Sequence, residues 1–253
     1  MRRASTVCVV KDTNGLEVLM VRRPLTSRFM PGVWVFPGGA VDEEDATDPV
    51  GFNNTDDEWR VAAMRELIEE TGIWITTDGT VERPVTDDPF GDVAQSGLTI
   101  DVDALIYFSN WITPEVFPIR FDTRFFLASV QDGTDGSVDG DELIDHEWVS
   151  PHEALARAAV GEWDIAFPTR ETLKLLGSEE SIESLVAKLR RHVEVPAIEP
   201  RLFVSESEAR ILMPDDEGFD AAGPSQKDPT ILARLQEVVS RGGLVPAEFK
   251  SRS

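Results

Sequence analysis

Cysteine is almost absent from this sequence of 253 residues, in which Cys8 is the single one. A lone cysteine cannot form an internal disulfide, and no histidine lies near it in sequence, so we interpret Cys8 as a buried apolar residue. Long apolar runs are absent too, since no stretch approaches the ~18 residues that span a membrane. The apolar stretch that follows Arg3 ends at the charged Lys11, so it is too short for the apolar region of a signal peptide. We therefore expect a cytoplasmic protein with no membrane partner.

Positive charge is scarce. The chain has 24 lysines and arginines against 47 aspartates and glutamates, which gives a net charge of −23. Such a surface repels a phosphate backbone and excludes nucleic acid as a partner. A small anionic substrate stays compatible with this charge if metal ions and local arginines screen it. The sequence also lacks a G-x-S-x-G motif, which speaks against a serine esterase.

What is present is a mixture of β-rich runs and amphipathic helices, which predicts an α/β (α+β) fold. Asn14-Gly15 predicts a tight turn between the first two strands. The stretch from Phe36 to about residue 58 and residues 77–97 are predicted to be polar loops. Strands are predicted at Ala4–Val10, Leu16–Val21, Val33–Phe36, 100–112, 121–130 and 145–149, with a pair at Arg201–Val204 and Ala209–Leu212. Further helices are predicted after Ser150 and at 168–176, 180–192 and 229–240.

One predicted helix carries the chemistry. It is expected to begin at Thr55, which forms a capping box with Glu58, and to end at Gly72. Its buried stripe is predicted to consist of Val61, Met64, Leu67 and Ile68.

Three glutamates, Glu66, Glu69 and Glu70, are spaced so that they share one face of this helix. Their like charges repel unless a cation offsets them, and hard carboxylate oxygens suit Mg²⁺ or Mn²⁺. The alternative is a solvated acidic face, which the motif EXXEE alone would favour. The context favours a metal site, because FPGG lies upstream, Arg65 precedes the first glutamate and Gly72 closes the helix.

The string RELIEETGI, residues 65–73, resembles the second half of the box of the Nudix hydrolase family, G-x5-E-x7-R-E-U-x-E-E-x-G-U with U aliphatic. The first half departs from it. Gly38-x5-Glu44 is present, but Arg65 follows Glu44 by 21 positions where the box has 8, so 13 residues are inserted. Either the insertion bulges out and Glu44 keeps its role, or Asp57 or Glu58 replaces it. We favour the second interpretation, which adds Asp57 and Glu58 to the expected metal ligands.

The resemblance implies a Nudix fold, a mixed sheet sandwiched between helices, and hydrolysis of a nucleoside diphosphate derivative with bound magnesium. Glu66 and Glu70 would ligate metal, Glu69 would ligate metal or help to activate water, and Arg65 would orient the carboxylates. The family often adds an acidic residue from a later loop. Glu142 is our candidate, ahead of Asp139 and Asp141, although a solvated acidic turn explains that loop equally well.

A second resemblance narrows the substrate. The segment before the glycines resembles the coenzyme A diphosphatase signature LLTxRSx3Rx3Gx3FPGG, with Pro24 in place of its serine and Val21 in place of its threonine. Arginine forks bind phosphate oxygens well. The resemblance therefore implies contacts to substrate from Arg23, Arg28, Gly38 and Gly39.

These features predict a coenzyme A or acyl-coenzyme A diphosphatase that yields 3′,5′-ADP and (acyl) phosphopantetheine. One alternative acts on ADP-ribose or another nucleoside diphosphate compound, and a second is a non-catalytic metabolite-binding module. Arg120 and Arg124 either contact substrate or brace the acidic strands.

We expect two parts, a Nudix domain at 1–165 and a mainly helical extension at 166–253 that packs on the core. The extension forms a lid, the interface of a homodimer or a cover for the core, and the sequence leaves these alternatives open.

Overall fold

A computed structural model describes residues 1–27, 30–47, 50–53, 57–115, 117, 119–191, 194–204 and 209–222. The chain forms two compact units. The larger one comprises Arg3–Phe108 and Arg124–Val195, and the smaller one comprises Met1–Arg2, Ser109–Thr123 and Pro196–Ser253. The boundary expected at residue 165 does not coincide with an edge of either unit. No helix within the described ranges is long and apolar enough to cross a membrane.

The larger unit is built on a sheet that begins with a β-hairpin. The hairpin joins β1 (Arg2–Asp12) to β2 (Leu16–Arg22), with Asp12 opposite Leu16. Gly15 has a positive φ of 131° and donates its N–H to Asp12 Oδ1 at 3.1 Å, which confirms the turn predicted from Asn14-Gly15. The spatial order of neighbouring strands in this sheet is β7-β8-β1-β2-β3. In addition, β4 pairs with β1 and β9 pairs with β2. The remaining strands are β3 (Trp34–Val35), β4 (Gly38–Ala40), β7 (Ile106–Ile112), β8 (Phe121–Ser129) and β9 (Asp145–Val149).

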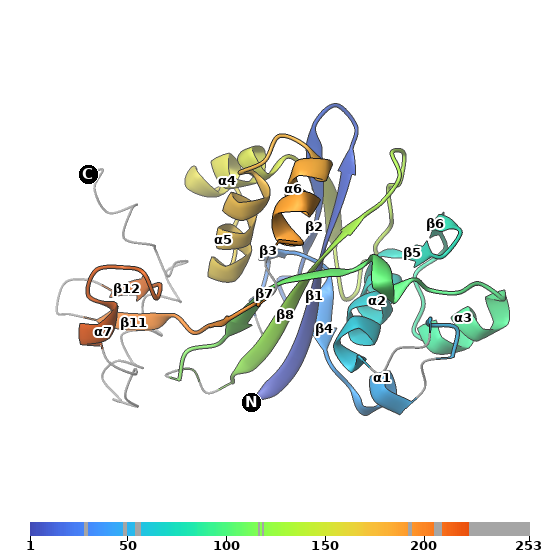
Figure 1. Ribbon diagram of the computed structural model, residues 1–253, viewed down its shortest axis with the longest axis horizontal. Coiled ribbons are helices and arrows are strands. Elements are labelled where there is room, and N and C mark those ends of the chain that lie inside the picture. Colours follow the sequence, from blue (N-terminus) through green and yellow to red (C-terminus); the bar gives the residue numbers. More distant parts are fainter. Residues whose placement is uncertain are drawn as a thin grey trace. The chain divides into compact units, whose positions relative to one another are not determined.

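Helices cover both faces of this sheet. Figure 1 shows α1 (Glu43–Thr47), α2 (Glu58–Thr71) and α3 (Pro89–Ser96) on one side of the strands, and α4, α5 and α6 on the other. These last three span Pro151–Ala159, Phe167–Leu176 and Ile182–Leu189. Ser150 caps α4 as predicted, since its side chain accepts the N–H of Glu153. The expected mixed sheet between helices is confirmed.

Helix α2 packs its apolar stripe into the main core. Val61, Met64, Leu67 and Ile68 are fully buried against sheet residues such as Val7. Gly72 ends the helix in the left-handed conformation, with φ of 64° and an N–H that donates to Ile68 O. Both the stripe and the C-terminal end are confirmed.

The predicted start of α2 is wrong. The helix begins at Glu58, and the side chain of Asp57 caps it by accepting the N–H of Trp59 at 3.1 Å. Thr55 lies outside the described residues. Aspartate is as good an N-cap as threonine, so the capping-box spacing did not discriminate between the two starts.

The two predicted loops contain regular structure. Residues 77–97 hold β6 (Gly79–Glu82), which pairs with β5 (Ile73–Thr76), and α3. Helix α3 has Pro89 in its first turn and Asp88 as N-cap, a combination that favours a helix start. The upstream loop holds β4 and α1. The strand predicted from residue 100 begins at Ile106, because η1 (Val102–Ala104) precedes it as a 3₁₀ turn.

The smaller unit contains the predicted late strand pair. β11 (Arg201–Val204) and β12 (Ala209–Leu212) are antiparallel, with Arg201 opposite Leu212. β10 (Ala197–Ile198) pairs in parallel with Asn110 and Trp111 at the end of β7, and α7 (Phe219–Ala222) follows β12. The helix predicted at 229–240 lies outside the described residues.

Candidate active site

Glu66, Glu69 and Glu70 form the carboxylate face of α2, which lies against β4. Glu70 Oε2 accepts the N–H of Gly38 at 2.8 Å, and a Cβ atom at Gly39 would overlap the carboxylate of Glu66. Glu66 and Glu69 expose only 13% and 24% of their side-chain surface. The glycines of FPGG therefore bring the strand close enough to hold two carboxylates of the helix, which requires a residue without a side chain at Gly39.

Arg65 organises this face with every N–H it has. Its Nε and Nη2 donate to the two carboxylate oxygens of Asp45 at 2.8 and 3.2 Å, and Nη2 also donates to Ala40 O at 2.8 Å. Its Nη1 donates to Glu66 at 3.0 Å and to Glu69 at 2.7 Å. A guanidinium has five N–H groups, and five hydrogen bonds use them all. The side chain is thereby fixed as a brace between α1, β4 and the glutamates.

Asp45 is the residue that sequence reasoning missed. It is 1% exposed on α1, whereas Glu44 beside it is exposed to solvent. Gly39-x5-Asp45 has the spacing of the first half of the Nudix box, shifted by one residue from Gly38-x5-Glu44. Arg65 follows Asp45 by 20 positions instead of 8, so the insertion of 12 residues comes after the carboxylate that pairs with the arginine.

Asp57 and Glu58, which we expected to ligate metal, are engaged elsewhere. Asp57 caps α2 and pairs with Arg60 at 3.3 Å, and Glu58 pairs with Arg3. Glu58 precedes Glu66 by eight residues, which is about 12 Å along a helix. The structure therefore does not bring these two carboxylates to the face of Glu66, Glu69 and Glu70.

We expect Asp57→Ala to lower the free energy of unfolding by about 1 kcal/mol, the usual cost of losing an N-cap. The turnover number should stay unchanged, since Asp57 lies more than two helical turns from Glu66, Glu69 and Glu70. Urea denaturation and steady-state kinetics on the same preparation measure both. A weakened magnesium dependence with unchanged stability would instead support Asp57 as a metal ligand.

The glutamates of this face have perturbed acidities. Burial raises the pKa of Glu66 to about 7, with Arg65 opposing the shift and Glu69 adding to it. Burial also raises the pKa of Glu70 well above its usual range, and the charge of Glu66 raises it further. Burial raises the pKa of Glu69 too, although Arg65 lowers it. Burial and mutual repulsion thus disfavour three ionised carboxylates, which is the electrostatic setting that a cation stabilises.

The donor set fits a hard divalent ion. Carboxylate oxygens are the ligands that Mg²⁺ and Mn²⁺ prefer, and no thiol or imidazole belongs to this face. Among the described residues, no three acidic, histidine or cysteine side chains already form a converged ligand set. N–H groups of Arg65 and Gly38 donate to one oxygen each of Glu66, Glu69 and Glu70.

Glu142 lies in the loop between β8 and β9 and is exposed. Burial is the main cause that raises the pKa of Glu69 and of Glu70, and the charge of Glu142 adds to both shifts. Asp139 turns its carboxylate inward to the loop backbone. Asp141 is exposed, like Glu142.

Two sets of arginines are candidates for substrate contact, Arg23 and Arg28 before the glycines and Arg120 and Arg124 in the later strand region. Arg23 follows β2 and is near Glu70, whose pKa it lowers against the effect of burial. Arg28 lies outside the described residues. Within the smaller unit Arg120 pairs with Glu199 at 2.6 Å. Arg124 stacks over the rings of Trp59 and Tyr107, 4.2 and 5.3 Å from their centroids.

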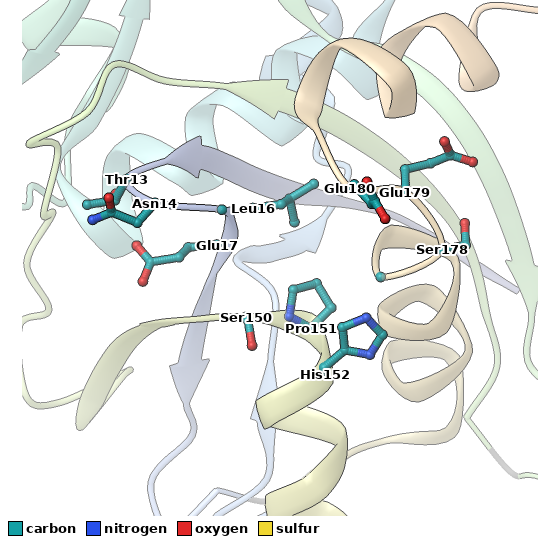
Figure 2. A pocket seen from close by; sticks show the side chains of 12 residues that line it. Thr13, Asn14, Leu16, Glu17, Ser150, Pro151, His152, Ser178, Glu179 and Glu180 are labelled. Atoms are coloured by element: carbon teal, nitrogen blue, oxygen red, sulfur yellow. The ribbon is translucent and has the colours of Figure 1, made fainter.

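A hollow of about 580 Å³ lies away from these residues (Figure 2). The turn of the β1–β2 hairpin, the start of α4 and the chain after α5 surround it, and none of the predicted site residues lines it. Glu179, one of its carboxylates, already pairs with Lys188 at 2.9 Å. The candidate active site is therefore the carboxylate face of α2, and not this hollow.

The fold is a sheet between helices, and its site is a row of glutamates that Arg65 braces against Gly38 and Gly39. These features are those of the class of metal-dependent hydrolases that the string RELIEETG, residues 65–72, resembles. A model of the NUDIX domain matches residues 1–168. The chain therefore belongs to the Nudix family of hydrolases, which act on phosphorus-containing anhydrides and generally use divalent metal ions.

Individual relatives agree with this family. The putative nudix hydrolase 7 of Caenorhabditis elegans is 34% identical, over 65% of this chain and 56% of that protein. The acyl-coenzyme A diphosphatase NUDT19 of Homo sapiens is 26% identical, over 55% of each. The crystal structure of a NUDIX hydrolase from Alicyclobacillus acidocaldarius is 32% identical, with a TM-score of 0.64 over 75% of this chain and 96% of that chain. The chain spans a little over half the length of the two curated relatives.

Proposed function

We propose that this protein hydrolyses the diphosphate of coenzyme A or acyl-coenzyme A. The observation that carries the proposal is that the charge of Arg23, the first arginine of the coenzyme A signature, lowers the pKa of Glu70 on the carboxylate face. An arginine there is suited to binding a phosphate oxygen of the substrate, beside glutamates that would hold a metal ion. The similarity to an acyl-coenzyme A diphosphatase supports the same substrate class.

In this proposal Glu66, Glu69 and Glu70 hold Mg²⁺, or Mn²⁺ in its place. The bound metal neutralises charge on the phosphoryl oxygens and lowers the pKa of water. Arg65 keeps Glu66 and Glu69 at fixed positions through its pairing with Asp45. Glu142, on the loop between β8 and β9, accepts the proton of the attacking water. Gly38 and Gly39 keep the strand close to the site, and Arg23 and Arg28 contact substrate phosphates.

The reaction adds the oxygen of water to one phosphorus of the diphosphate and breaks the bridging P–O bond. The leaving phosphate carries away the electron pair of that bond. The products are 3′,5′-ADP and phosphopantetheine, or acyl phosphopantetheine when the thiol is acylated.

We expect coenzyme A and acyl-coenzyme A to be turned over with magnesium, and ADP-ribose and NADH to be turned over less efficiently. Mass spectrometry of the products with each substrate at equal concentration measures this. Turnover of ADP-ribose without turnover of coenzyme A would overturn the substrate while leaving the hydrolase. Metal-dependent binding without any turnover would instead support a metabolite-binding module.

A further inference from the structure

The loop that carries Glu142, residues 130–144, is fastened to the sheet near its start. Lys11 Nζ donates to Thr134 O at 2.7 Å and lies 4.1 Å from the ring centroid of Trp148. Trp148 Nε1 in turn donates to Asp135 O at 2.8 Å. Lys11 is only 8% exposed, so this lysine is committed to holding the loop backbone.

The middle of the loop is tied to the chain around the end of α2. Ser137 N–H donates to Thr71 O at 2.9 Å, and Thr71 is the last residue of that helix. Glu82 on β6 accepts the N–H groups of Asp135 and Gly136 on one oxygen, at 2.7 and 2.6 Å. The loop is thus aligned against the helix that carries the metal-site glutamates.

The turn that presents Glu142 is closed by one side chain. Asp139 Oδ1 accepts the N–H groups of Asp141, Glu142 and Leu143 at 2.9, 3.0 and 3.3 Å. Gly140 N–H donates back to Leu143 O at 2.9 Å, and Leu143 is 1% exposed in the core. The backbone of Glu142 is therefore held between a buried leucine on one side and the Asp139 carboxylate on the other, while its side chain faces solvent.

We infer that Asp139 is a positioning residue, which fixes Glu142 relative to Glu69 and Glu70 by closing this turn. The inference rests on the proposed function, because it assigns Asp139 no chemistry of its own. A carboxylate oxygen in that place serves as an acceptor only, so its charge is dispensable and its geometry is not. Asparagine offers the same carbonyl acceptor at the same distance along the side chain, whereas alanine offers none.

The test is a double-mutant cycle with Asp139→Ala, Asp139→Asn and Glu142→Gln, on the substrate that the wild type turns over. We expect Asp139→Ala to lower kcat about 10- to 100-fold, the usual range for a residue that orients a catalytic group, with KM changed less than about twofold. Asp139→Asn should restore kcat to within about threefold of wild type. In the Glu142→Gln background, Asp139→Ala should lower kcat less than about threefold further, because the group it positions is gone.

Asp132→Ala is the matched control, since Asp132 is an exposed carboxylate of the same loop and should leave kcat unchanged. The inference is overturned if Asp139→Ala matches wild type, if asparagine is no better than alanine, or if the two substitutions act additively. Absence of turnover by the wild type on coenzyme A, acyl-coenzyme A and ADP-ribose would contradict the proposed function itself. The two failures are thus separate.

Discussion

Glu70→Gln abolishes hydrolysis while leaving the fold as stable as before, or more so. The carboxylate of Glu70 is held by Gly38 N–H, an interaction that a glutamine oxygen preserves. The substitution removes a charge that burial and Glu66 both disfavour. A metal site supplies several kcal/mol of transition-state stabilisation, and ~4 kcal/mol is about a thousandfold in rate. We expect kcat/KM to fall by at least about that factor.

The measurement combines steady-state kinetics with thermal unfolding in the absence and presence of magnesium. Wild type should gain stability with magnesium, by about 2.7 kcal/mol at a hundred times the dissociation constant, and Glu70→Gln should gain much less. Glu43→Gln is the matched control, because Glu43 is an exposed glutamate of α1. Full activity of Glu70→Gln, or an unchanged stabilisation by magnesium, would contradict a metal role for this face.

The sequence identified the helix and its chemistry because both depend on local spacing. Val61, Met64, Leu67 and Ile68 repeat with the helical period and are fully buried, so the opposite glutamates had to share a face. The hairpin at Asn14-Gly15 was predictable for the same reason, since a two-residue turn needs little beyond its own residues. Local patterns determine local structure, and these parts of the site are local.

Asp45 was not predictable in this way, because its partner is 20 residues further along the chain. Glu44 follows Gly38 with the spacing of the Nudix box, and Asp45 follows Gly39 with the same spacing. Only burial separates them, since Asp45 is 1% exposed and Glu44 faces solvent. Burial of a single side chain on a five-residue helix depends on how α1 packs against α2, which no spacing rule records. The sequence favoured Asp57 or Glu58, downstream of the insertion, in the place of the first box glutamate, whereas the carboxylate that pairs with Arg65 lies upstream of it.

Helix α3 was missed for a different reason. It is a single short helix of eight residues within a stretch rich in aspartate, glycine and proline, composition that is typical of loops. The signal that was available is Asp88 followed by Pro89, an N-cap with proline in the first turn. The packing of Phe52 against Phe90, 5.5 Å between ring centroids, ties this helix to the inserted segment and is a tertiary contact.

Asp45→Ala should be among the most destabilising single substitutions in the larger unit. It leaves Arg65, 8% exposed, without the partner of its Nε and one Nη2 hydrogen bond. Removing one member of a buried ion pair costs about 3–5 kcal/mol when the remaining charge is left without a partner. Arg65 keeps its pairs with Glu66 and Glu69, so we expect the free energy of unfolding to fall by about 2–3 kcal/mol in urea denaturation, the cost of losing hydrogen bonds to a buried charge. The rate should fall as well, since Arg65 would no longer be held against Glu66 and Glu69.

Asp42→Ala provides the control for this prediction. Asp42 also faces Arg65, but at 3.8 Å and with 66% of its side chain exposed, so its loss should change stability by less than about 0.5 kcal/mol. If Asp45→Ala costs no more than Asp42→Ala, the pair between Asp45 and Arg65 does not hold α1 to the catalytic helix. If stability falls but kcat does not, Arg65 holds Glu66 and Glu69 in place without Asp45. The combination of both losses identifies Asp45 as the carboxylate through which the interrupted box still fixes its arginine.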